Sequence, residues 1–427
     1  MKNTTPKRTS KLKRILTSLG PGLVTGASDD DPSGIVTYSQ AGSQFGLSTL
    51  WTALLTFPLM AAMQGMAARI GMVTCQGLTG TLRMHYPKWL LYAMIVFTFP
   101  AVILNIGADM QSMGAVANLL VPAIPSFSFS IFFTALLIYM IIRYPYQKMA
   151  GILKWLCLGL LLYLIVPFLV RQHWSNVLRH AFTPEVHLNK DFLGILVAIL
   201  GTTISPYLFF WQATMEVEDQ QHNQSSKNEK RIFVDKRALE NMRSDVNIGM
   251  LFSNLVMFFV ILTAGSVLFP AGIRNIETVE QAATALKPLA GKLSYVLFAV
   301  GVIGTGFLAI PVLAGCVSYM LAETFEFSMG LDKKFNEAKR FYAVIIVSLV
   351  AGLCMQFLGL SPVKALLYTA ILYGLTSPVL IAMILHIANN KKIMGENTNS
   401  RLSNILGFLT LLLMTVAAVG LIYFSFW

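Results

Sequence analysis

Long apolar segments alternate with short polar connections along the whole chain. A helix needs about twenty apolar residues to cross the hydrocarbon core of a membrane, and segments of that length recur throughout the sequence. The pattern predicts an all-α membrane protein with about eleven transmembrane helices. The expected spans are 18–41, 49–73, 88–116, 127–143, 150–171, 192–215, 247–269, 292–320, 341–359, 363–386 and 403–426.

The lysines and arginines predict how these helices are oriented. They gather before the first span and in every second connection after it, whereas the other connections are poorer in them. Because basic connections stay in the cytoplasm, we expect residues 1–17 to form a cytoplasmic tail and the C-terminus to lie outside. The polar segment 216–245 predicts a flexible cytoplasmic loop. We expect a multi-pass protein of the plasma or inner membrane.

Composition narrows the class of protein. Of the 427 residues, 55% are hydrophobic and 12% are charged, whereas soluble proteins carry about 25% charged residues. The excess apolar surface therefore needs the lipid bilayer as its partner. The net charge of +12 does not indicate nucleic acid, because no nucleic-acid-binding motif accompanies it. No catalytic motif is present, so we do not expect an enzyme. We also expect no cofactor and no obligate protein partner.

The first predicted span is interrupted in its middle. Residues 20–34 read Gly-Pro-Gly-Leu-Val-Thr-Gly-Ala-Ser-Asp-Asp-Asp-Pro-Ser-Gly. One charge at mid-membrane costs about 2.5–3.5 kcal/mol on insertion scales, and Pro32 removes a backbone donor. A helix broken there exposes carbonyls, which is tolerated around a protein-lined or watery cavity. Carboxylates and free carbonyls together suit a hard cation. The alternative is an ordinary interfacial loop between shorter helices.

The sixth predicted span carries a similar interruption at 201–206, Gly-Thr-Thr-Ile-Ser-Pro. Taken alone, it could be a simple proline kink. Its position relative to the first break favours a paired arrangement, because corresponding elements are offset by five helices, an odd number, and the two halves must then have opposite orientations. We predict one transmembrane domain over 1–427, with inverted five-helix repeats at 18–171 and 192–386 and an eleventh helix at 403–426.

Other polar residues within the spans are candidates for an ion or proton path. Asp109 lies in the third span, and an acid at that depth suggests such a route. Gln64, Tyr207 and Gln212 are further candidates. The alternative for Asp109 is a structural partner for another polar group, and the alternative for the others is contact between helices.

These motifs resemble the NRAMP family of divalent metal transporters over nearly the whole chain. Residues 31–34, Asp-Pro-Ser-Gly, are similar to the family's Asp-Pro-Gly-Asn break, and 205–207, Ser-Pro-Tyr, fall where it has Met-Pro-His. Residues 40–46, Trp51, Asp109 and 362–366 also fit. The resemblance implies a LeuT-like fold and divalent metal ion transport by alternating access around a midplane site.

The resemblance also implies ligands. Asp31 takes the place of the family's metal-binding carboxylate, and Thr202 that of a backbone-carbonyl donor. With the neighbouring oxygen-bearing residues, the candidate metal set is Ser28, Asp29, Asp30, Asp31, Gly34, Thr202 and Ser205.

Four departures from the family pattern indicate which ion is transported. Gly34 replaces the asparagine, Ser205 the methionine, Tyr207 the histidine and Ser112 a second acid. A thioether favours transition metals, whereas magnesium takes oxygen ligands and keeps several waters. The sequence therefore resembles the NRAMP-related magnesium transporter branch. We expect Mg²⁺ or Mn²⁺ as cargo, with Fe²⁺ also permitted, and the missing histidine and acid argue against proton coupling.

Two other functions are compatible with a membrane protein of this kind. A small organic amine or amino acid could pair its ammonium with an aspartate of the first break, inside a cage of aromatic side chains. The aromatic residues available for that cage are Tyr207, Phe209, Phe210 and Trp211. A receptor or structural role is the least favoured, because no signalling domain is attached.

Overall fold

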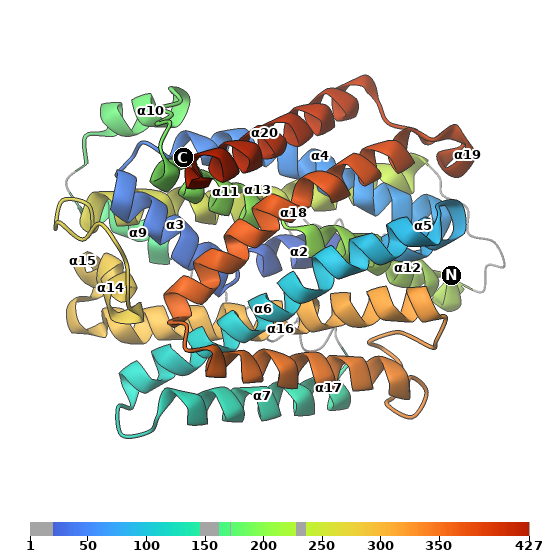
Figure 1. Cartoon of the computed structure of the whole chain (residues 1–427), viewed down its shortest axis with the longest axis horizontal. Coiled ribbons are helices and arrows are strands. Elements are labelled where there is room, and N and C mark those ends of the chain that lie inside the picture. Colours follow the sequence, from blue (N-terminus) through green and yellow to red (C-terminus); the bar gives the residue numbers. More distant parts are fainter. Residues whose placement is uncertain (1–19, 146–161, 171, 228–235, 427) are drawn as a thin grey trace, which may run out of the picture.

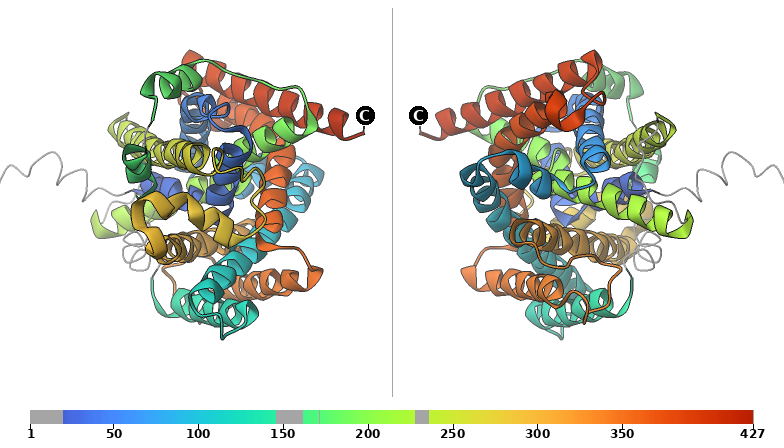
Figure 2. Two further views of the ribbon diagram at one scale, coloured as in Figure 1. Left: turned by 90° about the vertical axis from the view of Figure 1, so that its left-hand side faces the viewer. Right: turned by 90° about the vertical axis from the view of Figure 1, so that its right-hand side faces the viewer.

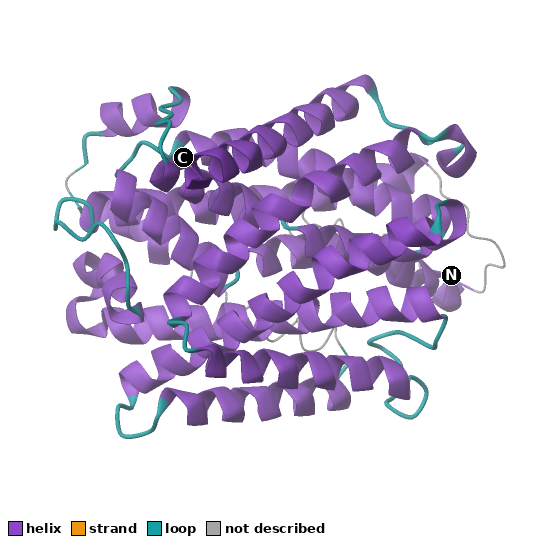
Figure 3. Ribbon diagram, in the orientation of Figure 1, coloured by secondary structure: helices purple, strands orange, loops and turns teal. Residues whose placement is uncertain are grey.

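The computed structural model describes residues 20–145, 162–170, 172–227 and 236–426. All regular elements in these ranges are helices (Figure 3), as the hydrophobic pattern predicts. The α-helices are α2 (Pro21–Asp29), α3 (Pro32–Phe45), α4 (Trp51–Thr74), α5 (Leu78–His85), α6 (Lys88–Leu120), α7 (Ser126–Arg143), α9 (Leu162–Leu169), α10 (Trp174–Phe182), α11 (Lys190–Thr203), α12 (Pro206–Lys227), α13 (Lys236–Val267), α14 (Val279–Ala283), α15 (Lys287–Ala290), α16 (Ser294–Phe325), α17 (Lys339–Cys354), α18 (Pro362–Asn389), α19 (Lys391–Met394) and α20 (Arg401–Phe426).

Nine helical segments of the described part are long and apolar enough to cross a membrane. They coincide with the second to fourth and the sixth to eleventh predicted spans, and α11 and α12 together count as one of them. The first predicted span is present as two shorter helices, α2 and α3. The tail at 1–17 and most of the fifth span at 150–171 lie outside the described residues, which include only α9 of that span.

The polar segment 216–245 is more ordered than the sequence suggests. The loop prediction is wrong for 216–227 and 236–245, because α12 continues to Lys227 and α13 begins at Lys236. Residues 228–235 lie outside the described ranges. Glutamate, glutamine, lysine and arginine are good helix formers, and extending an established helix needs no new nucleus. The two apolar helices therefore continue into polar sequence.

The long helices form one bundle in which α2 and α3 are central (Figure 1). Helix α13 packs along both of them, while α6 packs against α16 and α18. At one edge of the bundle α7 lies beside α17, and at the opposite edge α20 lies along α18 and α11 (Figures 1 and 2). The two short helices of the first span are thus enclosed by longer ones.

Glycines allow α2 to lie directly against α13. A Cβ at Gly22 would come within 2.6 Å of the Val246 backbone nitrogen, and a Cβ at Gly26 would meet the backbone of Gly249. The Asp245 carboxylate also accepts the N–H groups of Gly20 (3.2 Å) and Gly22 (2.7 Å), which are free donors at the start of a helix. Close packing and a cap from its neighbour therefore hold this short helix in place.

Both predicted helix breaks are present. Helix α2 ends at Asp29 and α3 begins at Pro32, while α11 ends at Thr203 and α12 begins at Pro206. Proline has no N–H and its backbone angle suits the first turn of a helix, so each proline starts a new helix. The break in the sixth span is therefore an interruption between two helices and not a simple kink.

Candidate functional site

The two breaks lie side by side and are joined by hydroxyl groups. Ser33 Oγ is 3.2 Å from Thr202 Oγ1, and Tyr38 Oη is 3.0 Å from Thr203 Oγ1. All four side chains are buried. The contacts connect the start of α3 to the end of α11, so the two interruptions form one polar region inside the bundle.

Asp31 is fixed at the head of α3 by three hydrogen bonds. Its Oδ1 accepts from Ser33 Oγ at 2.6 Å and from the Gly34 N–H at 2.9 Å. Its Oδ2 accepts from Asn105 Nδ2 of α6 at 2.9 Å. A carboxylate at this capping position is also stabilised by the positive end of the helix dipole. The structure thus holds Asp31 in one orientation, with only 2% of its surface exposed.

Asp29 and Asp30 turn toward a different helix. Ser253 of α13 donates to Asp29 Oδ2 at 2.7 Å and lies 3.4 Å from Asp30 Oδ1. The remaining oxygens, Asp29 Oδ1 and Asp30 Oδ2, have no hydrogen-bond partner among the residues described. Within the described residues, no group of three or more Asp, Glu, His or Cys side chains is arranged to hold a metal ion. The three aspartates are therefore neighbours in sequence but do not converge on one point.

The carboxylates around the first break have no cationic partner among the residues that the structure describes. Asp29, Asp30, Asp31 and Asp109 are all buried, and none of them appears in an ion pair within the part of the chain that the structure describes. Burying an ionised carboxylate is costly unless it is paired or coordinates a metal. A bound cation would supply the missing positive charge, so the chemistry of this region suits a cation.

The second break presents oxygen atoms toward the first. The Ser205 hydroxyl donates to the carbonyls of Gly201 (3.2 Å) and Thr202 (2.5 Å). A carbonyl has a second lone pair, so the Thr202 oxygen can still accept another contact. A Cβ at Gly34 would lie 3.6 Å from Thr202 Oγ1 and 3.4 Å from the Asp29 carbonyl oxygen. Glycine at this position therefore leaves space between the breaks.

Tyr207 reaches the first break through the Ser28 carbonyl. Its hydroxyl donates to the Ser28 carbonyl at 3.3 Å, and its ring lies 5.7 Å from that of Tyr373. The Ser28 hydroxyl donates back to the carbonyl of Val24 at 2.8 Å. Of the Ser28 oxygens, the carbonyl is thus the one that faces the second broken helix.

The remaining path candidates are less closely connected to the site. Gln212 accepts from Thr25 Oγ1 (2.5 Å) and donates to Glu216 (2.8 Å), so it ties α12 to the earlier part of α2. Gln64 is buried on α4 with no hydrogen bond to either side-chain amide atom. Asp109 is fully buried on α6, and neither of its oxygens has a hydrogen-bond partner in the described part of the chain.

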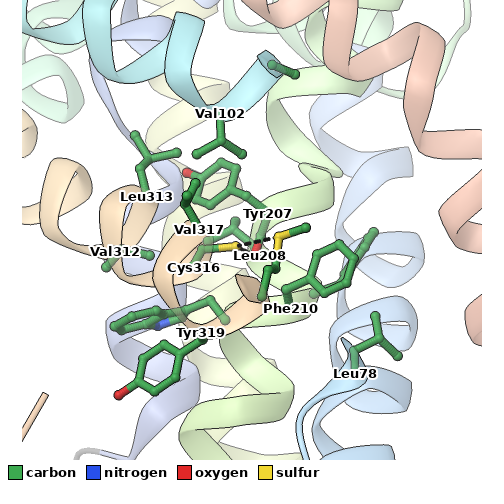
Figure 4. Packing of buried hydrophobic residues seen from close by; sticks show 14 of the residues in the cluster. Leu78, Val102, Tyr207, Leu208, Phe210, Val312, Leu313, Cys316, Val317 and Tyr319 are labelled. Carbon is green, nitrogen blue, oxygen red and sulfur yellow. Dashed lines mark hydrogen bonds between the residues drawn. The ribbon is translucent and has the colours of Figure 1, made fainter. Parts of the chain in front are cut away.

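The aromatic residues after Pro206 do not form a cage around Asp31. Tyr207, Phe209, Phe210 and Trp211 belong to the main hydrophobic core. Figure 4 shows Tyr207 and Phe210 among aliphatic side chains, with Leu313, Cys316 and Val317 of α16 on one side. This packing does not favour recognition of an organic ammonium.

The sequence pattern did not identify two residues of this region, Asn105 and Ser253, as site residues. Asn105 stands one helical turn before Asp109, on the same face of α6, and that spacing could have singled it out. No comparable signal distinguishes Ser253 from other hydroxyl residues within spans. Both come from helices far from the first break in sequence.

Comparisons with known proteins agree over almost the full length. A family model described as "Natural resistance-associated macrophage protein-like" matches residues 22–424. A "Divalent metal cation transporter MntH" of Caldanaerobacter subterraneus is 25% identical, covering 93% of this chain and 91% of that protein. One of the same name from Clostridium acetobutylicum is 24% identical, with 98% and 93% covered.

Solved structures show the same fold. A manganese transporter of Eremococcus coleocola superposes with a TM-score of 0.75 at 17% identity, covering 99% of this chain and 88% of that chain. Mhp1, a nucleobase-cation-symport-1 family transporter, gives a TM-score of 0.57 at 13% identity, with 96% and 93% covered. The match of the family model to residues 22–424, with the two broken helices inside it, establishes that this chain belongs to the Nramp family.

Proposed function

We propose that this chain carries Mg²⁺ or Mn²⁺ across the cell membrane, with Fe²⁺ also permitted. The general function rests on family membership: the chain is a multi-pass membrane transporter of divalent metal cations. Its named relatives are transporters and not enzymes. The transported ion is the substrate. The identity of the ion is inferred from the oxygen atoms at the two breaks.

One observation carries the proposal: the buried carboxylate of Asp31 is linked through Ser33 to the second broken helix and forms no ion pair within the described residues. We propose Asp31 as the main ligand, with the Thr202 carbonyl and the Ser205 hydroxyl on the opposite side. Asp29, Asp30, Ser28 and the space at Gly34 complete the polar surroundings. Carboxylate, carbonyl and water oxygens are the ligands that magnesium and manganese accept.

The replacement of the family's methionine by Ser205 supports Mg²⁺ or Mn²⁺ as the transported ion. Ser205 stands where the family has methionine, and its hydroxyl contributes oxygen. One methionine does lie near the second break, since Met257 Sδ is 3.6 Å from Thr203 Oγ1. The Thr203 hydroxyl donates to this sulfur. The groups that the two breaks themselves contribute are oxygen atoms, so we propose oxygen as the chemistry of the site.

We propose alternating access between the two halves, 18–171 and 192–386, around the paired breaks. Broken helices at corresponding positions of inverted repeats are typical of such transporters. Tyr207 and Ser112 replace the family's histidine and second acid, so we propose that proton coupling is not required. A divalent ion entering a cell gains about 4.6 kcal/mol per 100 mV of membrane potential, which is sufficient to drive uptake. The basic connections support a cytoplasmic N-terminus and an external C-terminus.

The central test is replacement of Asp31 in the full chain, reconstituted in proteoliposomes. Asp31→Ala is expected to abolish uptake of Mg²⁺ and Mn²⁺, because the main anionic ligand is lost while the helices still pack. Asp191→Ala, an exposed acid in the first turn of α11, is the matched control and should leave uptake unchanged. Undiminished uptake by a folded Asp31→Ala protein would remove Asp31 from the site.

A further inference from the structure

A third helix, α6, contributes to the region around Asp31 in addition to the two broken ones. Its Asn105 is fully buried and donates from Nδ2 to Asp31 Oδ2 at 2.9 Å. The other carboxylate oxygen is already occupied by Ser33 and Gly34. Asn105 is thus the side chain from outside the break that fixes the direction of this carboxylate.

The chemistry of the pair determines which way the Asn105 amide faces. An ionised carboxylate only accepts hydrogen bonds, so the NH₂ group must point at Asp31 and the amide oxygen must point away from it. That oxygen, Asn105 Oδ1, is buried and makes no hydrogen bond of good geometry within the described residues, although the Tyr373 hydroxyl interacts with the Asn105 amide group. Leaving a buried acceptor unsatisfied costs about 1–3 kcal/mol. The arrangement is therefore incomplete until a donor or a cation reaches this atom.

The surroundings of Asn105 favour a cation with its water shell. Asp109 lies one turn further along the same face of α6, and its two oxygens are also buried without a partner. No cationic side chain pairs with Asp31 or Asp109 within the described residues. An amide oxygen is a ligand for hard cations, and it can equally accept a proton from a metal-bound water.

We propose that Asn105 is a positioning and selectivity residue of the cation site, an inference that rests on the proposed function. Its N–H holds Asp31 in the orientation that binds the ion, and its Oδ1 contacts the ion or its water shell from the α6 side. Because magnesium gives up water reluctantly, an acceptor for metal-bound water stabilises Mg²⁺ more than an ion that binds directly. Asn105 therefore favours Mg²⁺ over Mn²⁺.

The test compares Asn105→Leu and Asn105→Asp with wild type in proteoliposomes, measuring KM and kcat for Mg²⁺ and for Mn²⁺. Leucine keeps the approximate size but removes both polar atoms. We expect the KM for Mg²⁺ to rise about tenfold, the effect of losing one hydrogen bond to a charged group, and the KM for Mn²⁺ to rise less. Aspartate keeps an acceptor oxygen but loses the N–H donor that orients Asp31, so it should raise the KM for both ions and keep the preference for Mg²⁺ over Mn²⁺.

The matched control is Gln111→Leu on the same helix. Gln111 donates to the Leu360 carbonyl at 2.7 Å, so its replacement removes a structural hydrogen bond away from Asp31. This variant should lower the melting temperature and leave the ratio of the two KM values unchanged. If Asn105 only stabilises the fold, Asn105→Leu will lower the melting temperature and leave the ratio of the two KM values unchanged, as in Gln111→Leu. That outcome overturns the inference.

Either Asn105 variant gives a decisive result if the other does not fold. A folded Asn105→Leu with a KM for Mg²⁺ within about twofold of wild type contradicts it. If only Asn105→Asp folds, KM values for both ions that equal those of wild type contradict it. Failure of wild type to transport either ion would instead overturn the proposed function, so the two failures are distinguishable.

Discussion

Asp29, Asp30 and Asp31 follow one another in sequence but occupy different environments. Asp31 caps α3 and accepts from Asn105 of α6, whereas Asp29 and Asp30 share the hydroxyl of Ser253 on α13. The helix break reverses the direction of the side chains between residues 30 and 31. Asp31 accepts a hydrogen bond from Ser33, whose hydroxyl also contacts Thr202 of the second break, which is why we propose it as the main ligand of the three.

Ser205 offers a direct test of ligand softness. Ser205→Met introduces a thioether beside the Thr202 carbonyl, and sulfur favours softer transition metals. We expect binding of Mn²⁺ and Cd²⁺ to tighten about tenfold relative to Mg²⁺, equivalent to about 1.4 kcal/mol. Inhibition of Mg²⁺ uptake by increasing Cd²⁺ measures this shift. Ser205→Ala controls for loss of the hydroxyl alone, and equal Cd²⁺ sensitivity in both variants would contradict the prediction.

Among the helices, the short α2 depends most clearly on its neighbour. It has nine residues, too few for a stable isolated helix in water. Its backbone lies against that of α13 at Gly26 and Gly249, and Asp245 of α13 caps its first turn. The first half of the interrupted span is thus held by packing and not by its own length.

Adding bulk at this contact should separate the two helices. Gly26→Val would place Cβ against the backbone of Gly249, and overpacking of this kind costs about 1–3 kcal/mol. A lower melting temperature in detergent, with reduced uptake, is the expected result. Gly65→Ala on α4 is the control, because no atom lies within 4 Å of an added Cβ there. Equal melting temperatures for the two variants would show that this contact tolerates expansion.

The extents of α12 and α13 were less predictable than the breaks. Prolines marked the starts of α3 and α12, since proline interrupts a helix by covalent geometry. The outer ends of α12 and α13 carry polar residues, which are compatible with either a helix or a loop. The hydrophobic pattern covers only the apolar part of each helix, so it does not predict where the helix ends. The established apolar helices propagate into these residues, because extending a helix needs no new nucleus.

For the molecule as a whole, the central property is buried negative charge without fixed positive charge. Asp29, Asp30, Asp31 and Asp109 lie inside the bundle, while the ion pairs found in the described residues are Arg83–Glu326 and the histidine contact His180–Glu185. A site of this kind attracts cations from either side of the membrane. Direction of transport must then come from the electrochemical gradient.

Uptake should therefore follow membrane potential. An inside-negative potential of about 100 mV, imposed on proteoliposomes with potassium and valinomycin, provides about 4.6 kcal/mol for a divalent ion. We expect faster Mg²⁺ entry under this potential and no acidification reported by an internal pH dye. Liposomes without protein give the background rate. Entry that ignores the potential, or that acidifies the interior in step with the ion, would contradict uncoupled transport.

The amino-acid sequence alone determined the all-helical membrane architecture, the two breaks and the placement of Asp31 at one of them. These follow from local properties: the length of apolar segments, the backbone chemistry of Pro32 and Pro206, and the cost of charge in lipid. The resemblance to the Nramp family could also be seen there, because its motifs are contiguous.

Only the tertiary structure decided which residues surround Asp31. Asn105 is 74 positions away along the chain and Thr202 lies on the other broken helix, joined to the first through Ser33 at 3.2 Å. Such contacts depend on how helices pack, and the pattern of apolar and polar positions along one helix does not contain that information. For the same reason the sequence could not separate Asp31 from Asp29 and Asp30, since packing against α6 or α13 distinguishes them.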